Sequence, residues 1–157
     1  MNKTHDTHWD TVYRTKASDA VSWYRPHLET SIELIQRVAP ELSASIIDVG
    51  GGESTLVDDL LAKGYRSISV LDISPTAIDV ARKRVRDPRQ NLTWIVGDIT
   101  QVALPGQSYD LWHDRAVFHF LTAQEDRAAY VQRVADSMSA SLAAPVARKR
   151  RRYVHMK

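Results

Sequence analysis

Three consecutive glycines, Gly50–Gly52, follow a short run of β-branched residues and precede a pattern typical of a helix. Residues 45–49, SIIDV, indicate a buried strand. Residues 54–64 place apolar side chains on one helical face, namely Leu56, Val57, Leu60 and Leu61. Glycine opens backbone conformations that other residues avoid, and it lets a neighbouring group approach the main chain closely. The sequence therefore predicts a tight strand-to-helix turn at these glycines.

The same alternation of strand and helix patterns continues along the chain. Ser74-Pro75 pairs a helix-capping residue with the residue best tolerated at the first helical position. Thr122 and Glu125 have the spacing of a capping box before a helix that reaches Met138. Further strands are predicted over 67–74, 92–98 and 109–114. Strands that alternate with helices form parallel units with right-handed crossovers, so we predict an α/β fold with a Rossmann-like, doubly wound parallel sheet.

Composition excludes several classes of protein. Hydrophobic residues make up 43% of the 157 residues and charged residues 25%, as in ordinary globular proteins. Cysteine is absent, which excludes disulfides and thiolate metal sites, and the histidines show no metal-ligand spacing. We see no secretory signal and no apolar run long enough to span a bilayer, so we expect a cytoplasmic protein without a membrane partner.

The net charge of +2 comes from one end of the chain. Residues 148–157 hold six of the 21 Lys and Arg and no Asp or Glu, which leaves 15 basic against 19 acidic residues, or −4, for residues 1–147. The body is mildly acidic, so the basic balance is weak support for nucleic-acid binding, and we expect no specific nucleic-acid partner.

Two nucleotide-binding patterns compete at the glycines. A dinucleotide fingerprint, G-x-G-x-x-G, fails because its sixth position counted from Gly50 is Thr55. The pattern D-x-G-x-G-x-[GS] is matched by Asp48, Gly50, Gly52 and Ser54. With it, the segment from about Trp9 to Met138 resembles class I S-adenosylmethionine-dependent methyltransferases. The stretches HWDTVYRTK (8–16) and DLWHDRAVFHFL (110–121) resemble a bacterial group related to protein-lysine methyltransferases that begin with a W-D-x-x-Y helix.

The resemblance implies S-adenosyl-L-methionine as cofactor and assigns its contacts. Asp72, 20 residues after Gly52, would accept from both ribose hydroxyls, a role that dehydrogenases share. Asp98 would bind the adenine amino group and the backbone of Ile99 a ring nitrogen. Asp48 would lie beside the methionine half, where it orients the loop or the amino group. The remaining predicted cofactor residues are Gly50, Gly51, Gly52, Ser54 and Ile73, with Trp9 and Tyr13 on a lid helix or, alternatively, on an amphipathic helix of the core.

The resemblance also places the methyl group beside the residues that follow the fourth strand. Asp114 and His113 are the candidate catalytic residues. Asp114 would orient a substrate amine or form a structural bridge with Arg115 or His113. His113 would line the cofactor or act as a base. The related lysine enzymes keep a glycine in this turn that HDRAVF lacks, so the methyl acceptor, a protein lysine or a small molecule, stays open.

The resemblance stops near residue 138. Family members have seven strands, whereas four are predicted here, and residues 139–157 show neither glycine nor β-alternation. We expect a methyltransferase domain over residues 1–138, truncated after the fourth strand and its helix, and a basic, disordered tail over 139–157. The tail would be a solvated segment, a nucleic-acid patch or a frameshifted ending. Two alternative functions are an inactive cofactor-binding fragment and an NAD-binding oxidoreductase.

Overall fold

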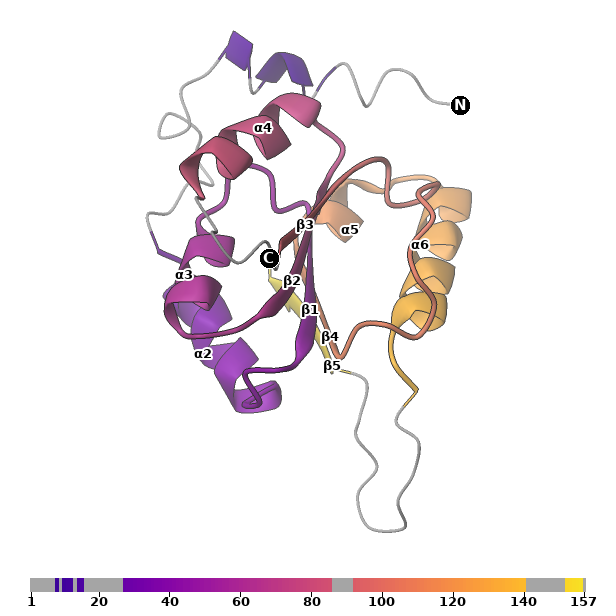
Figure 1. The fold of residues 1–157 in the computed structure, drawn as a ribbon. Coiled ribbons are helices and arrows are strands. Elements are labelled where there is room, and N and C mark those ends of the chain that lie inside the picture. The colour runs from indigo at the N-terminus through magenta and orange to yellow at the C-terminus, as the bar shows by residue number, and fades with distance from the viewer. Residues whose placement is uncertain are drawn as a thin grey trace.

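The structure is a computed structural model that describes residues 8, 10–12, 14–15, 27–85, 92–140 and 152–156, with the main chain alone for Arg115 and residues 152–156. Its centre is a five-stranded sheet in the order β3-β2-β1-β4-β5, in which all neighbouring strands are parallel (Figure 1). The strands are β1 Ser45–Val49, β2 Ser67–Asp72, β3 Leu92–Val96, β4 Leu111–Arg115 and β5 Arg152–Met156. The labelled helices are α2 Glu29–Val38, α3 Leu56–Ala62, α4 Pro75–Arg84, α5 Val117–Phe120 and α6 Gln124–Ser137.

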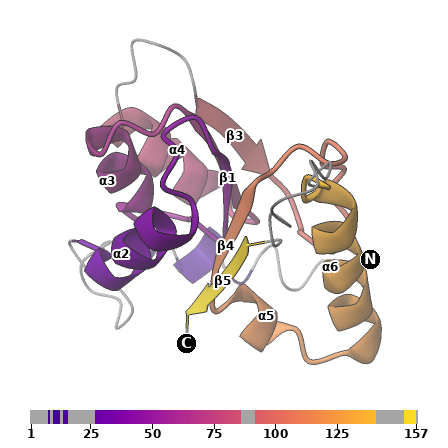
Figure 2. The same ribbon diagram turned by 90° about the horizontal axis from the view of Figure 1, so that it is seen from below.

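Helices cover both faces of the sheet, which confirms the predicted doubly wound fold. Helices α2, α3 and α4 lie on one face, and α5 and α6 lie on the other (Figures 1 and 2). The alternation of side chains along β1 explains why both faces are apolar. Ile46 packs into the cluster under α2, α3 and α4, whereas Ile47 and Val49 pack into the cluster that includes Tyr130 of α6.

Local signals are visible at some of the helix ends. Ser74 precedes α4, and its hydroxyl accepts a hydrogen bond from the Ala77 N–H at 3.2 Å, as its sequence predicts. Gly64 follows α3 with φ +93°, a conformation suited to a helix end. The predicted capping box at Thr122 is wrong, because α6 begins after Ala123 and no side chain caps it. Acidic residues in the first turn of α6 interact favourably with the helix dipole instead.

Residues 152–156 correct the predicted extent of the fold. They form β5, which pairs in parallel with β4 from Leu111↔Arg152 to Arg115↔Met156. Figure 2 shows β5 beside β4 at the edge of the sheet. The expectation that the whole segment 139–157 lies outside the fold is therefore wrong for residues 152–156. The ladder with β4 supplies the hydrogen bonds that define this strand, whereas the sequence analysis looked for side-chain alternation.

The order of the strands fixes where a ligand would bind. The chain passes from β1 to β2 and β3 on one side, and then returns to form β4 on the other side of β1. Such a reversal separates the two halves of the sheet at the carboxyl ends of β1 and β4, where ligands bind in open parallel sheets. The glycine turn and Asp114 lie at these ends.

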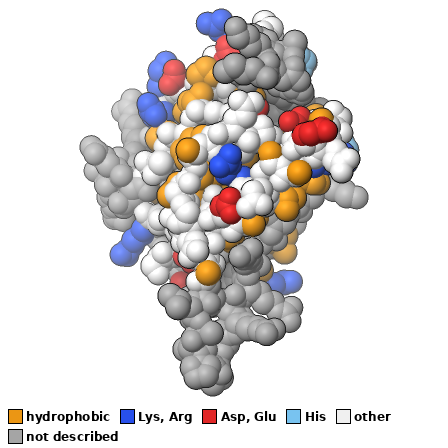
Figure 3. All heavy atoms as spheres, turned by 90° about the vertical axis from the view of Figure 1, so that its right-hand side faces the viewer, with side chains coloured by type: hydrophobic (Ala, Val, Ile, Leu, Met, Phe, Trp, Pro, Cys, Tyr) orange, Lys and Arg blue, Asp and Glu red, His pale blue; other side chains and the backbone are white. Residues whose placement is uncertain are grey.

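The surface on the α6 side carries mixed side chains. Figure 3 shows apolar side chains interspersed with polar ones and a few charged ones. Val131 and Phe120 are among the exposed large apolar residues, at 57% and 47%. Scattered apolar residues of this kind are normal on a protein surface. Among the described residues, none of the helices has the length and apolar character that crossing a bilayer requires.

A chain that ends at Ala140 is expected to melt at a lower temperature than the full chain. Without β5, β4 becomes an open edge and loses the ladder with β5 along residues 111–115. In a chain of this size, each 1 kcal/mol of lost stability lowers Tm by about 2–4 °C. Thermal unfolding measures the difference, and hydrogen exchange should quicken at the β4 amides. Equal melting and equal exchange in both chains would show that residues 152–156 do not support the sheet.

Candidate functional site

The glycine turn after β1 is packed too tightly for side chains. The N–H groups of Gly50 and Gly51 both donate to the Leu71 carbonyl of β2, at 2.8 and 3.1 Å. A Cβ at Gly50 would lie 2.2 Å from Cγ2 of Val117, and one at Gly51 would lie 2.6 Å from Cγ1 of Val70. Gly50 and Gly52 also have positive φ angles, 73° and 48°. Packing within the protein thus requires the bare turn, and the predicted tight turn at these glycines is confirmed.

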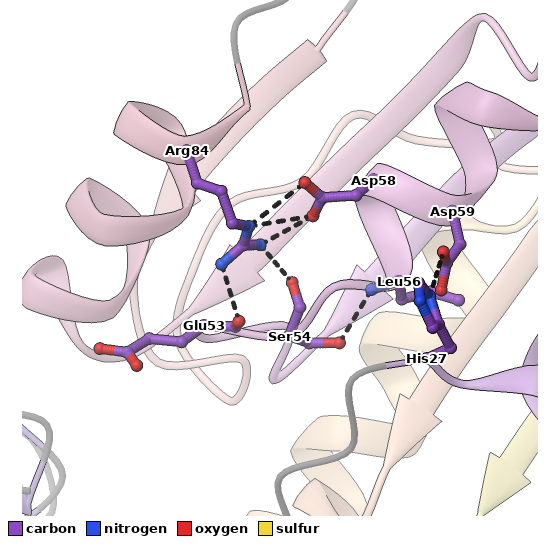
Figure 4. A network of polar contacts seen from close by, with 7 residues as sticks. All are labelled: His27, Glu53, Ser54, Leu56, Asp58, Asp59 and Arg84. Atoms are coloured by element: carbon purple, nitrogen blue, oxygen red, sulfur yellow. Dashed lines mark hydrogen bonds and ion pairs between the residues drawn. The ribbon is translucent and has the colours of Figure 1, made fainter. Parts of the chain in front are cut away.

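Arg84, at the end of α4, holds the far end of this turn. Its guanidinium donates to the Glu53 carbonyl at 3.0 Å and to the Ser54 carbonyl at 2.6 Å. It also forms a bidentate ion pair with Asp58 of α3, with contacts of 2.8–3.2 Å (Figure 4). Ser54 itself accepts a hydrogen bond from the Leu56 N–H at 3.1 Å, which helps begin α3. The fork of Arg84 therefore ties α3, α4 and the glycine turn together.

Asp72 ends β2 beside the turn and is 5% exposed. Its carboxylate accepts from the Ser74 N–H at 2.9 Å. Burial, foremost, raises the pKa of Asp72 from 3.8 to about 6, and the negative charge of Asp48 adds to this. Hydrogen bonds from the backbone N–H groups of Ser74, Gly52 and Ile73 act in the opposite direction. Asp72 thus binds the glycine turn and remains a buried carboxylate at a strand end, the position predicted for the ribose contact.

Asp98 follows β3 and is half-buried. Its Oδ1 accepts from the N–H and the hydroxyl of Thr100, at 2.8 and 2.7 Å. These bonds shape the turn that buries Ile99, which is 4% exposed. The Gly97 N–H donates to the Asp72 carbonyl at 2.9 Å, so the ends of β2 and β3 stay together. The structure places Asp98 and Ile99 next to the Asp72 end of the sheet, and one carboxylate oxygen of Asp98 is already engaged.

Asp48 and His113 form a buried polar link on the α2 side of the sheet. His113 Nδ1 lies 2.7 Å from Asp48 Oδ1, and His113 Nε2 lies 3.1 Å from the Ser31 hydroxyl on α2. All three residues are at most 2% exposed. Both ring nitrogens of His113 are therefore occupied within the core, which leaves neither available as a base. This position does not support the predicted catalytic or cofactor-lining role of His113.

Asp114 points to the opposite face of the sheet and is fully buried. Its Oδ1 accepts from the Val117 N–H at 2.8 Å, and its Oδ2 accepts from the Phe118 N–H at 3.2 Å. Its Oδ2 also accepts from the Tyr130 hydroxyl. Asp114 thus caps the first N–H groups of α5. Ala116, the residue just before α5, has a left-handed backbone conformation with a φ of 74°.

The predicted pairing of Asp114 with His113 is wrong, because neighbouring residues of a strand point to opposite faces. The alternative pairing with Arg115 involves a side chain outside the described atoms. The partner on the α6 side is Tyr130, whose hydroxyl also accepts from Trp112 Nε1 at 2.9 Å. Tyr130 lies 16 residues after Asp114, and no local motif relates the two positions.

Part of the N-terminal helix lies beside Asp72. Residues 8, 10–12 and 14–15 are helical, and Oδ1 of Asp10 accepts from the Ser74 hydroxyl at 3.0 Å and from the Thr76 N–H at 3.3 Å. The Thr76 hydroxyl is the main cause that holds the pKa of Asp10 below its ordinary value. These contacts fasten the helix to the beginning of α4. Trp9 and Tyr13 lie outside the described residues, so their place over the cofactor stays a prediction.

The surroundings of the glycine turn are acidic. Asp48, Glu53 and Asp72 are buried carboxylates on or beside the turn, whereas Arg84 is committed to Asp58 and to main-chain carbonyls. Oε2 of Glu53 is buried without a hydrogen-bond partner in the part of the chain that the structure describes. The sequence analysis missed Glu53 and Arg84. Glu53 lies inside the motif and could have been noticed as an acid at its variable position. Among the described residues, no group of acids and histidines could hold a metal ion.

Comparisons with known proteins agree with this geometry. The family model described as "Methyltransferase domain" matches residues 46–140, more than half of the chain. The eEF1A lysine and N-terminal methyltransferase of Bos taurus is 25% identical over 119 residues, which cover 76% of this chain and 17% of that protein. The chain thus spans a small part of that relative's length.

Solved structures share the fold. An S-adenosylmethionine-dependent methyltransferase from Mesorhizobium loti has a TM-score of 0.57 and 23% identity, covering 68% of this chain and 48% of its own. Phosphoethanolamine N-methyltransferase 1 of Haemonchus contortus, solved with phosphoethanolamine and S-adenosylhomocysteine, has a TM-score of 0.67 and 14% identity, covering 88% and 30%. Because the family model covers most of the described sheet and these folds match it, the chain belongs to the class I S-adenosylmethionine-dependent methyltransferase superfamily.

Proposed function

We propose that this chain binds S-adenosyl-L-methionine at the carboxyl ends of β1, β2 and β3 and serves methyl transfer to an amine. The observation that carries the proposal is the buried carboxylate of Asp72 at the end of β2, bonded to the glycine turn and accompanied by Asp48. Carboxylates accept hydrogen bonds from the two hydroxyls of a ribose. An acidic site also favours a cofactor with a positive sulfonium, whereas it repels a pyrophosphate, which argues against NAD.

The predicted cofactor-binding residues would each contact a different part of the cofactor. Asp72 would accept from the ribose hydroxyls, with the neighbouring Ile73 beside it, and Asp98 and the backbone of Ile99 would contact adenine. The turn Gly50–Gly52 with Ser54 would lie along the methionine arm. Trp9 and Tyr13 would cover the site from the N-terminal helix, as the resemblance implies. The cofactor-binding unit would extend over residues 1–138, with β5 added to its sheet.

When bound, the cofactor supplies a methyl group on a sulfonium sulfur, which an amine can attack. The chain would mainly hold the two reactants in line and exclude water. Asp114 would act on the acceptor through the shape of the β4–α5 turn, since its own oxygens bind Val117, Phe118 and Tyr130. The relative from Bos taurus is named an eEF1A lysine and N-terminal methyltransferase, which supports an amine as acceptor. A protein lysine or a small amine fits this proposal as acceptor. The cytoplasmic location expected from the sequence is also compatible with it.

A second candidate is a chain that binds the cofactor without turnover. It is favoured by the engagement of both candidate catalytic side chains, His113 and Asp114, inside the protein. Incubation with S-adenosylmethionine labelled in its methyl group, with cell extract and with free amines as acceptors, tests the two. We expect label in an amine-containing product. Binding without any transferred label would establish the second candidate, and binding of NAD in place of S-adenosylhomocysteine would contradict both.

Asp72→Ala is expected to weaken S-adenosylhomocysteine binding at least about tenfold, and more than Asp98→Ala does. Asp72 can offer acceptors to two hydroxyls, whereas Oδ1 of Asp98 is occupied by Thr100. Hydrogen bonds to charged groups contribute about 1.5–3 kcal/mol each, and 1.4 kcal/mol corresponds to about tenfold in affinity. Isothermal titration of both variants, beside thermal melts that confirm folding, measures the order. The reverse order would show that the ribose lies elsewhere.

Binding of S-adenosylhomocysteine is expected to weaken as pH falls below about 6, because Asp72, with its pKa raised to about 6, then takes up a proton. The protonated carboxyl accepts less well from the ribose hydroxyls. The stability of the fold changes with pH in the opposite direction. Between about pH 4 and 6, Asp72 holds a proton in the folded chain that it lacks in the unfolded chain. This contribution to stability is therefore present at low pH and is lost as pH rises through 6.

Titration from pH 5 to 8 measures the binding effect. Asp72→Asn should bind weakly with a flat pH profile, while Asp98→Asn should keep the slope of the wild type. An unchanged slope in Asp72→Asn would assign the pH dependence to another group.

A further inference from the structure

Glu53 carries a buried carboxylate that the described part of the chain leaves incompletely satisfied. The residue is 8% exposed, and its Oε2 has no hydrogen-bond partner among the described residues. A buried charge is strongly unfavourable unless it is paired and hydrogen-bonded. An unsatisfied buried polar group in a native protein has a physical cause, such as backbone strain, a functional role, or a water or ion that binds it.

Arg84 fixes the main chain of Glu53, whereas the Glu53 side chain extends away from Arg84. Its carbonyl accepts from Arg84 Nη1, and the neighbouring Ser54 carbonyl accepts from Arg84 Nη2. Figure 4 shows the Glu53 carboxylate directed away from Arg84 and Asp58. The nearby cation therefore neutralises Asp58 rather than Glu53.

The acids beside the turn favour a cationic group as a partner of the Glu53 carboxylate. Asp48 is occupied on one oxygen by His113, and its charge acts on Asp72. Oδ2 of Asp48 lies against Gly51, since a Cβ built there would be 2.9 Å from it. Glu53 thus adds a third buried carboxylate on or beside the turn, where Arg84 is paired with Asp58, and a positively charged ligand group would complement it.

We propose that Glu53 is a specificity-determining residue of the cofactor site, where its carboxylate binds the ammonium group of the methionine arm. This inference rests on the proposed function and assigns to Glu53 a contact that the sequence had associated with Asp48. The charge-assisted bond would satisfy Oε2 and would select ligands that carry the free amino group.

The test pairs one substitution with a series of truncated ligands. Wild type and Glu53→Gln are titrated with S-adenosylmethionine, S-adenosylhomocysteine and 5′-methylthioadenosine, which keeps adenine, ribose and sulfur but lacks the amino acid. Glu53→Gln is expected to bind S-adenosylhomocysteine about tenfold or more weakly and to bind 5′-methylthioadenosine within about twofold of wild type. Glu33→Gln, an exposed carboxylate on α2, is the matched control. Glu53→Ala replaces Glu53→Gln if the latter fails to fold.

Each outcome decides the inference. Equal loss for S-adenosylhomocysteine and 5′-methylthioadenosine would assign Glu53 a structural role in the turn and overturn it. Loss confined to S-adenosylmethionine would place the sulfonium, not the ammonium, beside Glu53 and overturn it as well. Unchanged affinity of Glu53→Gln, with normal wild-type binding, would refute this inference alone. Absence of binding to the wild type would refute the proposed function and this inference together.

Discussion

The pairing of β1 between β2 and β4 is the constraint on which the rest of the structure depends. It buries β1 on both faces and brings the carboxyl ends of three strands to one place. Because the chain leaves β1 toward β2 and later returns on the opposite side, a crevice is expected where β1 ends. The glycine turn fits there only without side chains, since Gly50 and Gly51 donate to Leu71 and abut Val70 and Val117.

Two buried acids at neighbouring strand ends hold this arrangement from opposite faces. Asp48 joins β1 to α2 through His113 and Ser31, whereas Asp114 joins β4 to α5 and, through Tyr130, to α6. A buried carboxylate is tolerated when its oxygens are hydrogen-bonded; Asp114 meets this condition on both oxygens, and Asp48 on Oδ1. The acids therefore set the shape of the loops around the site, and any catalysis here would act mainly through positioning.

Charge is separated across the glycine turn. Arg84 lies on one side, where Asp58 and two main-chain carbonyls engage its guanidinium. Glu53 leaves the turn on the other side, away from Arg84, and Asp72 is bonded to the turn through the Gly52 N–H. The burial that raises the pKa of Asp72 makes its charged form electrostatically unfavourable, and carboxylates with such raised pKa values are common at binding sites. A ligand that brings positive charge and hydroxyl donors would relieve this, whereas a pyrophosphate would add to it.

The sequence by itself determined the elements and the kind of fold. Periodicity and end signals are local, so strands β1–β4, the cap at Ser74 and the stop at Gly64 could be predicted from neighbouring residues. The tertiary structure decided the partners of the acids. Asp48 and His113 are 65 residues apart, and they meet because strand pairing and side-chain alternation align them. The tertiary structure also decided that residues 152–156 form β5. The pairing of this edge strand depends on the main chain of β4 more than on the pattern of its own residues.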